Sequence, residues 1–297
     1  MRVATRGSAL ARWQAEHVAA ALRAADADLP VDLVVVETSG DRRLDVPIWE
    51  MGGKGVFVKE VQAAVLEGRA DLAVHSAKDL PAGTPDGLVI AAVPPRADPR
   101  DALVGSTIAD LPPGAVVATG SVRRRAQLAW LRPDLTFTGL RGNIETRLAR
   151  ADEVGAIVVA AAALERLDQL ARATELVDPS VMLPQVGQGA LAVECREDDD
   201  ELRRRLASIE DPRARVELEA ERGFLLELGG DCDLPAGAHA RVDTTGGVTI
   251  AGMVASLDGH AVLRREATGN DVDAVDLGRT LARRLLDDDG GASLLDR

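Results

Sequence analysis

The residues best suited to chemistry are basic side chains that gather in short motifs of an acidic chain. The net charge is −13, and lysine occurs only at Lys54, Lys59 and Lys78. A chain that confines its lysines to one short stretch can use them to bind an anion. Accidental clustering of surface lysines is the alternative.

Asp79 follows a segment, 71–75, that we expect to form a parallel strand. Open α/β sheets bind their ligands at the carboxyl ends of such strands. A carboxylate placed there could stabilise a cationic intermediate or shuttle a proton. Aspartate after a strand is also a common helix N-cap or turn residue, and both interpretations stay open.

Two expected strand-to-helix junctions carry arginines where the helix begins. Ser121 precedes Arg123 and Arg124 in the first junction, and Arg141 precedes the helix that contains Arg147 in the second. A helix N-terminus offers unpaired N–H groups and the positive end of a dipole, and guanidinium groups bind carboxylates in a bidentate manner. The junctions indicate an anion site; a solvated basic helix face is the alternative.

The two cysteines, Cys195 and Cys232, are too few for a disulfide framework, and we expect free thiols. Cys232 lies between Gly230 and Pro235, in a loop where an exposed thiol could act as a nucleophile or attachment point. A small buried hydrophobe is the more common role of cysteine. Neither zinc-ligand spacing nor a G-x-S-x-G pattern is present, so the sequence predicts no metal site and no hydrolase triad.

The segments that must position these residues alternate between strand and helix. The expected strands are 2–5, 31–38, 71–75, 116–119, 135–138, 156–160 and 190–195, and the expected helices are 8–24, 56–67, 121–132 and 143–151. The β-branched run 31–38 is typical of a buried parallel strand. From about residue 211 we expect a helix (213–228), three strands (238–242, 248–257 and 260–265) and a last helix (272–286).

Two segments rich in proline or glycine, 94–99 and 184–189, interrupt the alternation. A chain that crosses twice in this way predicts two α/β domains with a cleft between them. We therefore expect domain 1 at 1–95 and 190–208, domain 2 at 99–187, and a small α+β domain 3 at 211–297 that carries Cys232.

Composition limits the location and the partners. No apolar run approaches the roughly 20 residues that span a bilayer, and the first residues are too polar for an export signal, so we expect a cytoplasmic protein. The negative charge and the 2% aromatic content argue against nucleic-acid binding. An acidic surface with few lysines suggests a cytoplasm of high salt concentration.

Seven stretches of the chain, in order, resemble the hydroxymethylbilane synthase family, also called porphobilinogen deaminase. They are ATRGS (4–8), GGKGVFVKE (52–60), DLAVHSAKDLP (71–81), GSVRR (120–124), LRGN (140–143), VGQGA (186–190) and GDC (230–232). The resemblance implies two periplasmic-binding-protein-like α/β domains with a central cleft, plus a small α+β C-terminal domain.

The resemblance also implies a reaction. A transferase of porphyrin, and hence heme, biosynthesis joins four porphobilinogen molecules head to tail, releases four ammonia molecules, and then releases the linear tetrapyrrole by hydrolysis. A dipyrromethane cofactor, made from substrate, is held by a thioether to Cys232. Asp79 is the implied catalytic aspartate, which hydrogen-bonds pyrrole N–H groups, helps to expel the aminomethyl nitrogen and stabilises an azafulvene-like cation.

Each pyrrole carries an acetate and a propionate, which accounts for the basic motifs. The resemblance assigns the cofactor to Cys232, Lys78, Asp79, Ser121, Arg123, Arg124 and Gln188, and the substrate to Arg6, Ser8, Lys54, Phe57, Arg141, Arg147 and Arg166. It implies a monomer that binds porphobilinogen and neither nucleic acid, membrane nor metal.

Three positions depart from the family pattern: Glu50 where lysine is common, Gly120 where a second serine is usual, and Asp231 where glycine precedes the cysteine. An acid beside Cys232 should disfavour its thiolate.

Two other functions stay open. A solute-binding module would close two α/β domains on an anion without chemistry, but the absence of an export signal, the Lys78–Asp79 pair and the loop thiol count against it. A transferase without a bound cofactor predicts that Cys232→Ala retains turnover.

Overall fold

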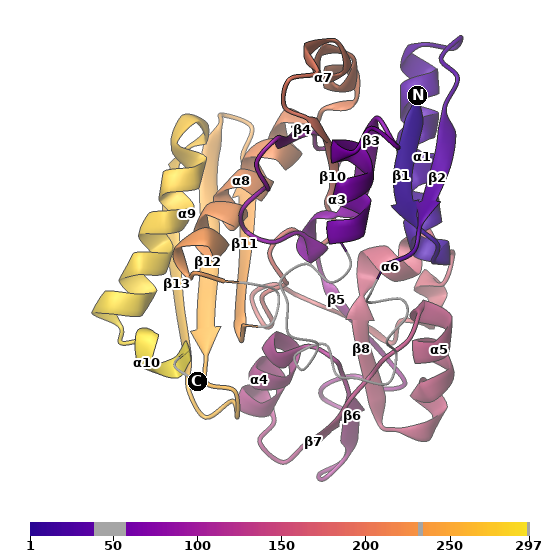
Figure 1. Cartoon of the computed structure of the whole chain (residues 1–297). Helices are drawn as coiled ribbons and strands as arrows, with labels where there is room; N and C mark the ends of the chain where they lie inside the picture. Colours follow the sequence, from indigo (N-terminus) through magenta and orange to yellow (C-terminus); the bar gives the residue numbers. More distant parts are fainter. Residues whose placement is uncertain (39–57, 231–233, 296–297) are drawn as a thin grey trace. The chain divides into compact units, whose positions relative to one another are not determined.

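The computed structural model describes residues 1–38, 58–230 and 234–295 (Figure 1). It divides into two compact units, 1–97 with 190–215 and 98–189 with 216–297. In the chain the units meet at Ala97/Asp98 and Gly189/Ala190, within or directly after the two expected crossings, and again at Arg215/Val216. The boundaries of three separate domains stay a prediction.

The first unit contains a five-stranded sheet. Its strands are β1 (Arg2–Arg6), β2 (Asp32–Val36), β3 (Leu72–Ser76), β4 (Leu88–Ala92) and β10 (Leu191–Arg196), in the order β2-β1-β3-β10-β4. β1 is parallel to β2 and β3, whereas β10 is antiparallel to β3 and β4. The β-branched run does form β2, but the expectation that it is buried is wrong: β2 is an edge strand, and Val35 is 51% exposed.

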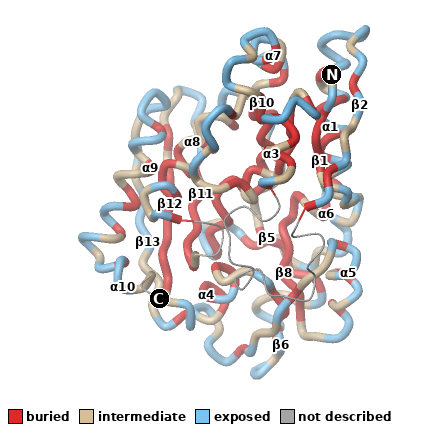
Figure 2. The backbone as a smooth tube through the Cα atoms, in the orientation of Figure 1, coloured by how far each residue is buried: buried red, intermediate tan, exposed pale blue. Residues whose placement is uncertain are grey.

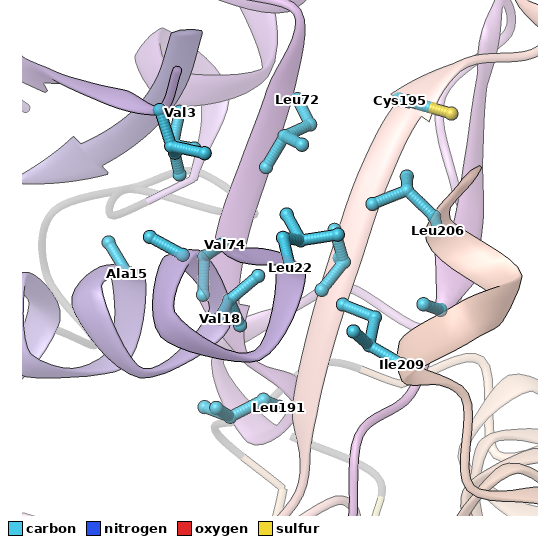
Figure 3. Packing of buried hydrophobic residues seen from close by; sticks show 14 of the residues in the cluster. Val3, Ala15, Val18, Leu22, Leu72, Val74, Leu191, Cys195, Leu206 and Ile209 are labelled. Carbon is cyan, nitrogen blue, oxygen red and sulfur yellow. The ribbon is translucent and has the colours of Figure 1, made fainter. Parts of the chain in front are cut away.

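Helices cover both faces of this sheet. α1 (Ala9–Ala25) is rich in alanine and buries Ala15, Val18 and Leu22, spaced three and four residues apart, against alternate residues of the strands (Figure 3). α3 (Lys59–Leu66) packs on the opposite face of the sheet, whose residues include Ala4 and Ala73. The central strands β3 and β10 are therefore buried almost throughout (Figure 2). α7 (Asp200–Leu206), which the sequence did not predict, follows β10.

The second unit repeats this arrangement. Its strands are β5 (Asp101–Val104), β6 (Val116–Ala118), β7 (Thr136–Thr138), β8 (Ala156–Ala160) and β9 (Glu175–Val177), in the order β7-β6-β8-β5-β9. Its helices include α4 (Val122–Leu131), α5 (Ile144–Ala149) and α6 (Ala161–Arg166). β6 is parallel to β7 and β8, and β5 is antiparallel to β8 and β9. In each sheet, the inner strand that runs antiparallel to its neighbours follows one of the two crossings between the units: β10 in the first sheet and β5 in the second.

The C-terminal part of the second unit is α+β, as predicted. α8 (Pro212–Glu227) begins at the end of the first unit and precedes an antiparallel sheet of β11 (Ala236–Val242), β12 (Gly247–Ala255) and β13 (Val262–Asn270). α9 (Ala274–Arg283) and the short α10 (Ala292–Leu295) follow. Gly223 of α8 and Gly278 of α9 leave no room for a Cβ against the backbone of the other helix, so the two helices pack in close contact.

The mixed α/β class with a small C-terminal α+β part is thus confirmed. Within the described ranges, no helix is both long and apolar enough to cross a membrane.

Candidate functional site

One edge of the first sheet collects four of the predicted site residues. β1 ends at Arg6 and leads into α1, whose N-cap is Ser8, with its Oγ accepting a hydrogen bond from the Ala11 N–H (3.3 Å). β3 runs parallel to β1 and leads into a 3-10 turn that contains Lys78 and Asp79. Because parallel strands end at the same edge, the structure brings these four residues to one side of the sheet.

Backbone hydrogen bonds on either side of Asp79 hold the turn in place. The Ala77 N–H donates to the carbonyl oxygen of Ala190 (3.0 Å), and the Leu80 N–H donates to that of Ala77 (3.2 Å). Ser76, not Asp79, is the N-cap of the turn. The interpretation of Asp79 as a helix N-cap is therefore wrong, whereas the alternative of a turn residue agrees with the 3-10 turn in which the half-buried Asp79 lies.

The strand-to-helix junctions of the second unit also lie at one sheet edge, because β6, β7 and β8 are parallel. Ser121 caps α4 by accepting from the Arg124 N–H (3.4 Å), and Asn143 caps α5 by accepting from the Thr146 N–H (2.9 Å). The junctions touch, since a Cβ added to Gly120 would stand 2.7 Å from the carbonyl oxygen of Leu140.

Arg123 and Arg124 point into the second unit, where both bind Asp101. The Nη1 atom of Arg123 donates to Asp101 Oδ2 (2.8 Å) and to the carbonyl oxygen of Leu183 (2.6 Å). Arg124 donates through Nε to Asp101 Oδ1 (2.9 Å) and through Nη1 to the carbonyl oxygen of Val158 (3.0 Å). The two guanidinium groups are nearly fully buried, so the idea of a solvated basic face is wrong for this helix.

Asp101 and Gln188 complete this buried cluster. Gln188 donates through Nε2 to Asp101 Oδ1 (2.9 Å) and to the carbonyl oxygen of Pro99 (2.7 Å), and its Oε1 accepts from Arg124 Nη2 (3.3 Å). Burial alone would raise the pKa of Asp101, but the charges of Arg123 and Arg124 and the hydrogen bonds lower it well below its usual range. Sequence reasoning missed Asp101, because a single aspartate that opens a strand carries no motif.

The other three arginines of the second unit that were predicted to be site residues differ in their surroundings. Arg141 is half-buried, and its Nη2 atom is buried without a hydrogen-bond partner. Arg147 donates through Nε to the carbonyl oxygen of Gly142 (2.9 Å). Arg166 donates to the carbonyl oxygen of Gly189 (2.7 Å), and its burial lowers its pKa to about 10, so it remains charged at neutral pH.

The structure describes one of the two cysteines. Cys195 is free and buried in β10, and burial together with the nearby Asp199 raises its pKa to about 11. Cys232, Lys54, Phe57 and Glu50 lie outside the described residues. In the part of the chain that the structure covers, no group of three or more His, Cys, Asp or Glu side chains could hold a metal ion.

Comparison with known proteins decides the family. Residues 1–204 match the family model for the porphobilinogen deaminase dipyromethane cofactor binding domain, and residues 216–287 match the porphobilinogen deaminase C-terminal domain. The chain belongs to the porphobilinogen deaminase family. The predicted resemblance is thereby confirmed.

Relatives of this porphobilinogen deaminase family member match along nearly their whole length. The chain is 48% identical over 301 residues to the porphobilinogen deaminase of Syntrophus aciditrophicus, covering 99% of this chain and 97% of the relative. It is 48% identical over 295 residues to that of Acidothermus cellulolyticus, covering 96% and 88%. A periplasmic His/Glu/Gln/Arg/opine family-binding protein from Silicibacter pomeroyi is similar at a TM-score of 0.37 and 14% identity, covering 70% of this chain and 88% of that one.

The described residues fit the dipyrromethane that the matched domain is named for. A dipyrromethane made from two substrate units carries several carboxylates. Arg141 offers a buried cationic N–H without an acceptor, and Arg166 offers a desolvated cation. Both are suited to bind carboxylates.

Proposed function

We propose that the chain is a hydroxymethylbilane synthase in which Asp79 is the catalytic aspartate, Cys232 holds the dipyrromethane, and the basic residues bind acetate and propionate groups. Membership of the porphobilinogen deaminase family assigns the reaction, the stepwise condensation of four porphobilinogen molecules. The observation that carries the residue assignment is the turn that holds Asp79 at the edge shared by Arg6 and Ser8.

Asp79 can act on the reacting ring in two ways. Its carboxylate can accept hydrogen bonds from pyrrole N–H groups and so orient the substrate. Each condensation forms one carbon–carbon bond and releases one ammonia molecule, and positive charge develops on the ring as the nitrogen leaves. A fixed carboxylate stabilises that charge, and the backbone hydrogen bonds of Ala77 and Leu80 supply the fixed position.

Cys232 is the cysteine suited to attachment. The buried Cys195 thiol, with its pKa raised to about 11, is a poor nucleophile. When bound, the dipyrromethane supplies the pyrrole carbon to which the first substrate is joined. We further assign it to Lys78, Asp79 and Ser121, and to Arg123, Arg124 and Gln188 as residues that shape the site from inside the second unit, since all three bind the buried Asp101.

Substrate binding is assigned to Arg6, Ser8, Lys54, Phe57, Arg141, Arg147 and Arg166, and the basic members of this set would bind the substrate carboxylates. Arg141 and Arg166 have the strongest support, because Arg141 has a buried Nη2 atom without a hydrogen-bond partner and the Arg166 guanidinium is desolvated by burial. We further propose that the protein works as a monomer in the cytoplasm and binds no nucleic acid, in keeping with its charge of −13.

Porphobilinogen consumption and bilane release test this proposal in the wild-type chain and in Asp79→Asn. The variant should fold and keep its Cys232 adduct, but its kcat should fall by about 10²- to 10⁴-fold, the usual contribution of a general acid or base. Asp86→Asn, an exposed aspartate of the same unit, is the control and should remain active. Near-normal turnover of Asp79→Asn would remove Asp79 from the mechanism, and binding without turnover in the wild-type chain would support a solute-binding module.

A further inference from the structure

Three polar side chains form a buried cluster between α3 and the first sheet: Gln62, His75 and Glu194, here called the Glu194 cluster. Gln62 Nε2 donates to both carboxylate oxygens of Glu194 (2.9 and 3.2 Å). His75 Nε2 lies 3.0 Å from Glu194 Oε2, at ion-pair distance but outside hydrogen-bond geometry. The three residues are only 4%, 6% and 0% exposed.

Apolar side chains pack on the same face of the sheet as the cluster. The same face of the sheet buries Ala4 and Ala73 against Val61, Ala64 and Val65 of α3. Burying a carboxylate and an imidazole in such a layer costs free energy that apolar residues of similar size would not cost. Stability is therefore a poor reason for the cluster, whereas fixing the register of the elements it joins is a well-attested use of buried polar groups.

Each member of the cluster lies close in sequence to a segment with a role in the proposed reaction. His75 is the penultimate residue of β3, four residues before Asp79. Gln62 is in the first turn of α3, two residues after the end of the motif 52–60 that carries Lys54 and Lys59. Glu194 follows Ala190, whose carbonyl oxygen accepts the Ala77 N–H at the start of the Asp79 turn.

A shift of one element past another would break the cluster. In the antiparallel β3–β10 pair, His75 is opposite Ala192 and Glu194 is opposite Ala73, so the His75–Glu194 contact is diagonal on one face. A slip of one residue would turn one of the two side chains to the other face. The hydrogen bonds from Gln62 to Glu194 hold α3 against the same pair of strands.

We propose that the Glu194 cluster is a positioning device that holds the end of β3 and the start of α3 in one register, so that Asp79 and the first residues of α3 keep a fixed geometry. The inference rests on the role proposed for Asp79. Its members do not touch the reacting atoms, so loss of the cluster should lower kcat through misplacement of Asp79 rather than weaken carboxylate binding.

Kinetics and hydrogen exchange of Glu194→Ala and the milder Glu194→Gln test this inference. Val193→Ala is the matched control, because Val193 is the preceding residue of β10 and is buried on the opposite face, against α1. We expect kcat of Glu194→Ala to fall by about 10- to 100-fold, since a misplacement of about 1 Å costs this much, with KM changed by less than about threefold. If Glu194→Ala does not fold, the same comparison is made with Glu194→Gln, for which we expect a smaller fall of the same kind.

Amide exchange gives a readout that does not depend on turnover. Exchange should accelerate in peptides covering 72–80 and 58–66 of the Glu194 variants, and not in Val193→Ala. Unchanged exchange in those peptides, or an equal fall in kcat in Val193→Ala, would overturn the inference. A wild-type chain that forms no bilane would instead refute the proposed function, and the exchange rates would still decide whether the cluster holds the two segments.

Discussion

Replacing Asp101 with asparagine should strongly lower the free energy of unfolding, although the two side chains have nearly the same shape. The Asp101 carboxylate is fully buried and accepts hydrogen bonds from Arg123, Arg124 and Gln188. Asparagine keeps the size of the side chain but leaves two buried guanidinium groups without a counter-charge. The protein must then bury net positive charge.

The cost follows from this geometry. Removing one partner of a buried ion pair destabilises a protein by about 3–5 kcal/mol, against a total stability of roughly 5–15 kcal/mol for a typical domain. The effect should depend on pH in a definite direction. The pKa of Asp101 is lowered in the folded state, so its contribution is present above the ordinary pKa of 3.8 and is lost as the pH falls toward the folded-state value.

Urea denaturation of the wild-type chain and Asp101→Asn at pH 7 and at pH 3 measures both effects. Asp71→Asn is the control, because its ion pair with Arg2 is partly exposed and should contribute little. The difference between wild type and Asp101→Asn should shrink at the lower pH. A loss of less than about 1 kcal/mol at pH 7 would refute the account of Arg123 and Arg124 as a buried cross-link.

Two further substitutions separate ligand-binding residues from structural ones. Arg141→Leu should leave stability unchanged or raise it, because it removes a buried donor without an acceptor, and the KM for porphobilinogen should rise by roughly 10- to 100-fold. Arg125→Leu, at an exposed arginine, is the control. A loss of stability in Arg141→Leu with an unchanged KM would contradict the binding role. Gly120→Ala should destabilise the chain by about 1–3 kcal/mol and raise KM, because its Cβ would displace the Leu140–Arg141 junction. Gly139→Ala, where a Cβ meets nothing within 4 Å, should do neither, and equal effects of the two glycine substitutions would contradict the contact.

Local sequence patterns predicted the elements that have strong periodicity or caps. The structure of α1 follows from its Ala-rich stripe and its Ser8 cap, and that of β8 from its apolar run. Each of these signals involves only residues close together in the sequence. β5, β9 and α6 were missed because no cap or turn motif marks them: β5 and β9 form by pairing with distant segments, and α6 begins without a side-chain cap. The antiparallel direction of β5 and β10 also follows from the crossings and not from any local signal.

The site was predictable in its positions and not in its contacts. Motifs located Asp79, Ser121 and Arg141 near strand ends, where the structure has them. The inward orientation of Arg123 and Arg124 depends on Asp101, 22 and 23 residues earlier in the chain. The partner of Gln62 in the Glu194 cluster is 132 residues away, so no local pattern could reveal it.

Intact-mass measurement of the purified, active chain tests the central claim most directly. The account predicts an added mass equal to two porphobilinogen units minus two ammonia molecules, because each unit forms its new bond with loss of one ammonia. Cys232→Ser should lack this mass and should not turn over porphobilinogen. An active wild-type chain with an unmodified Cys232, or a Cys232→Ser variant with normal turnover, would contradict the account.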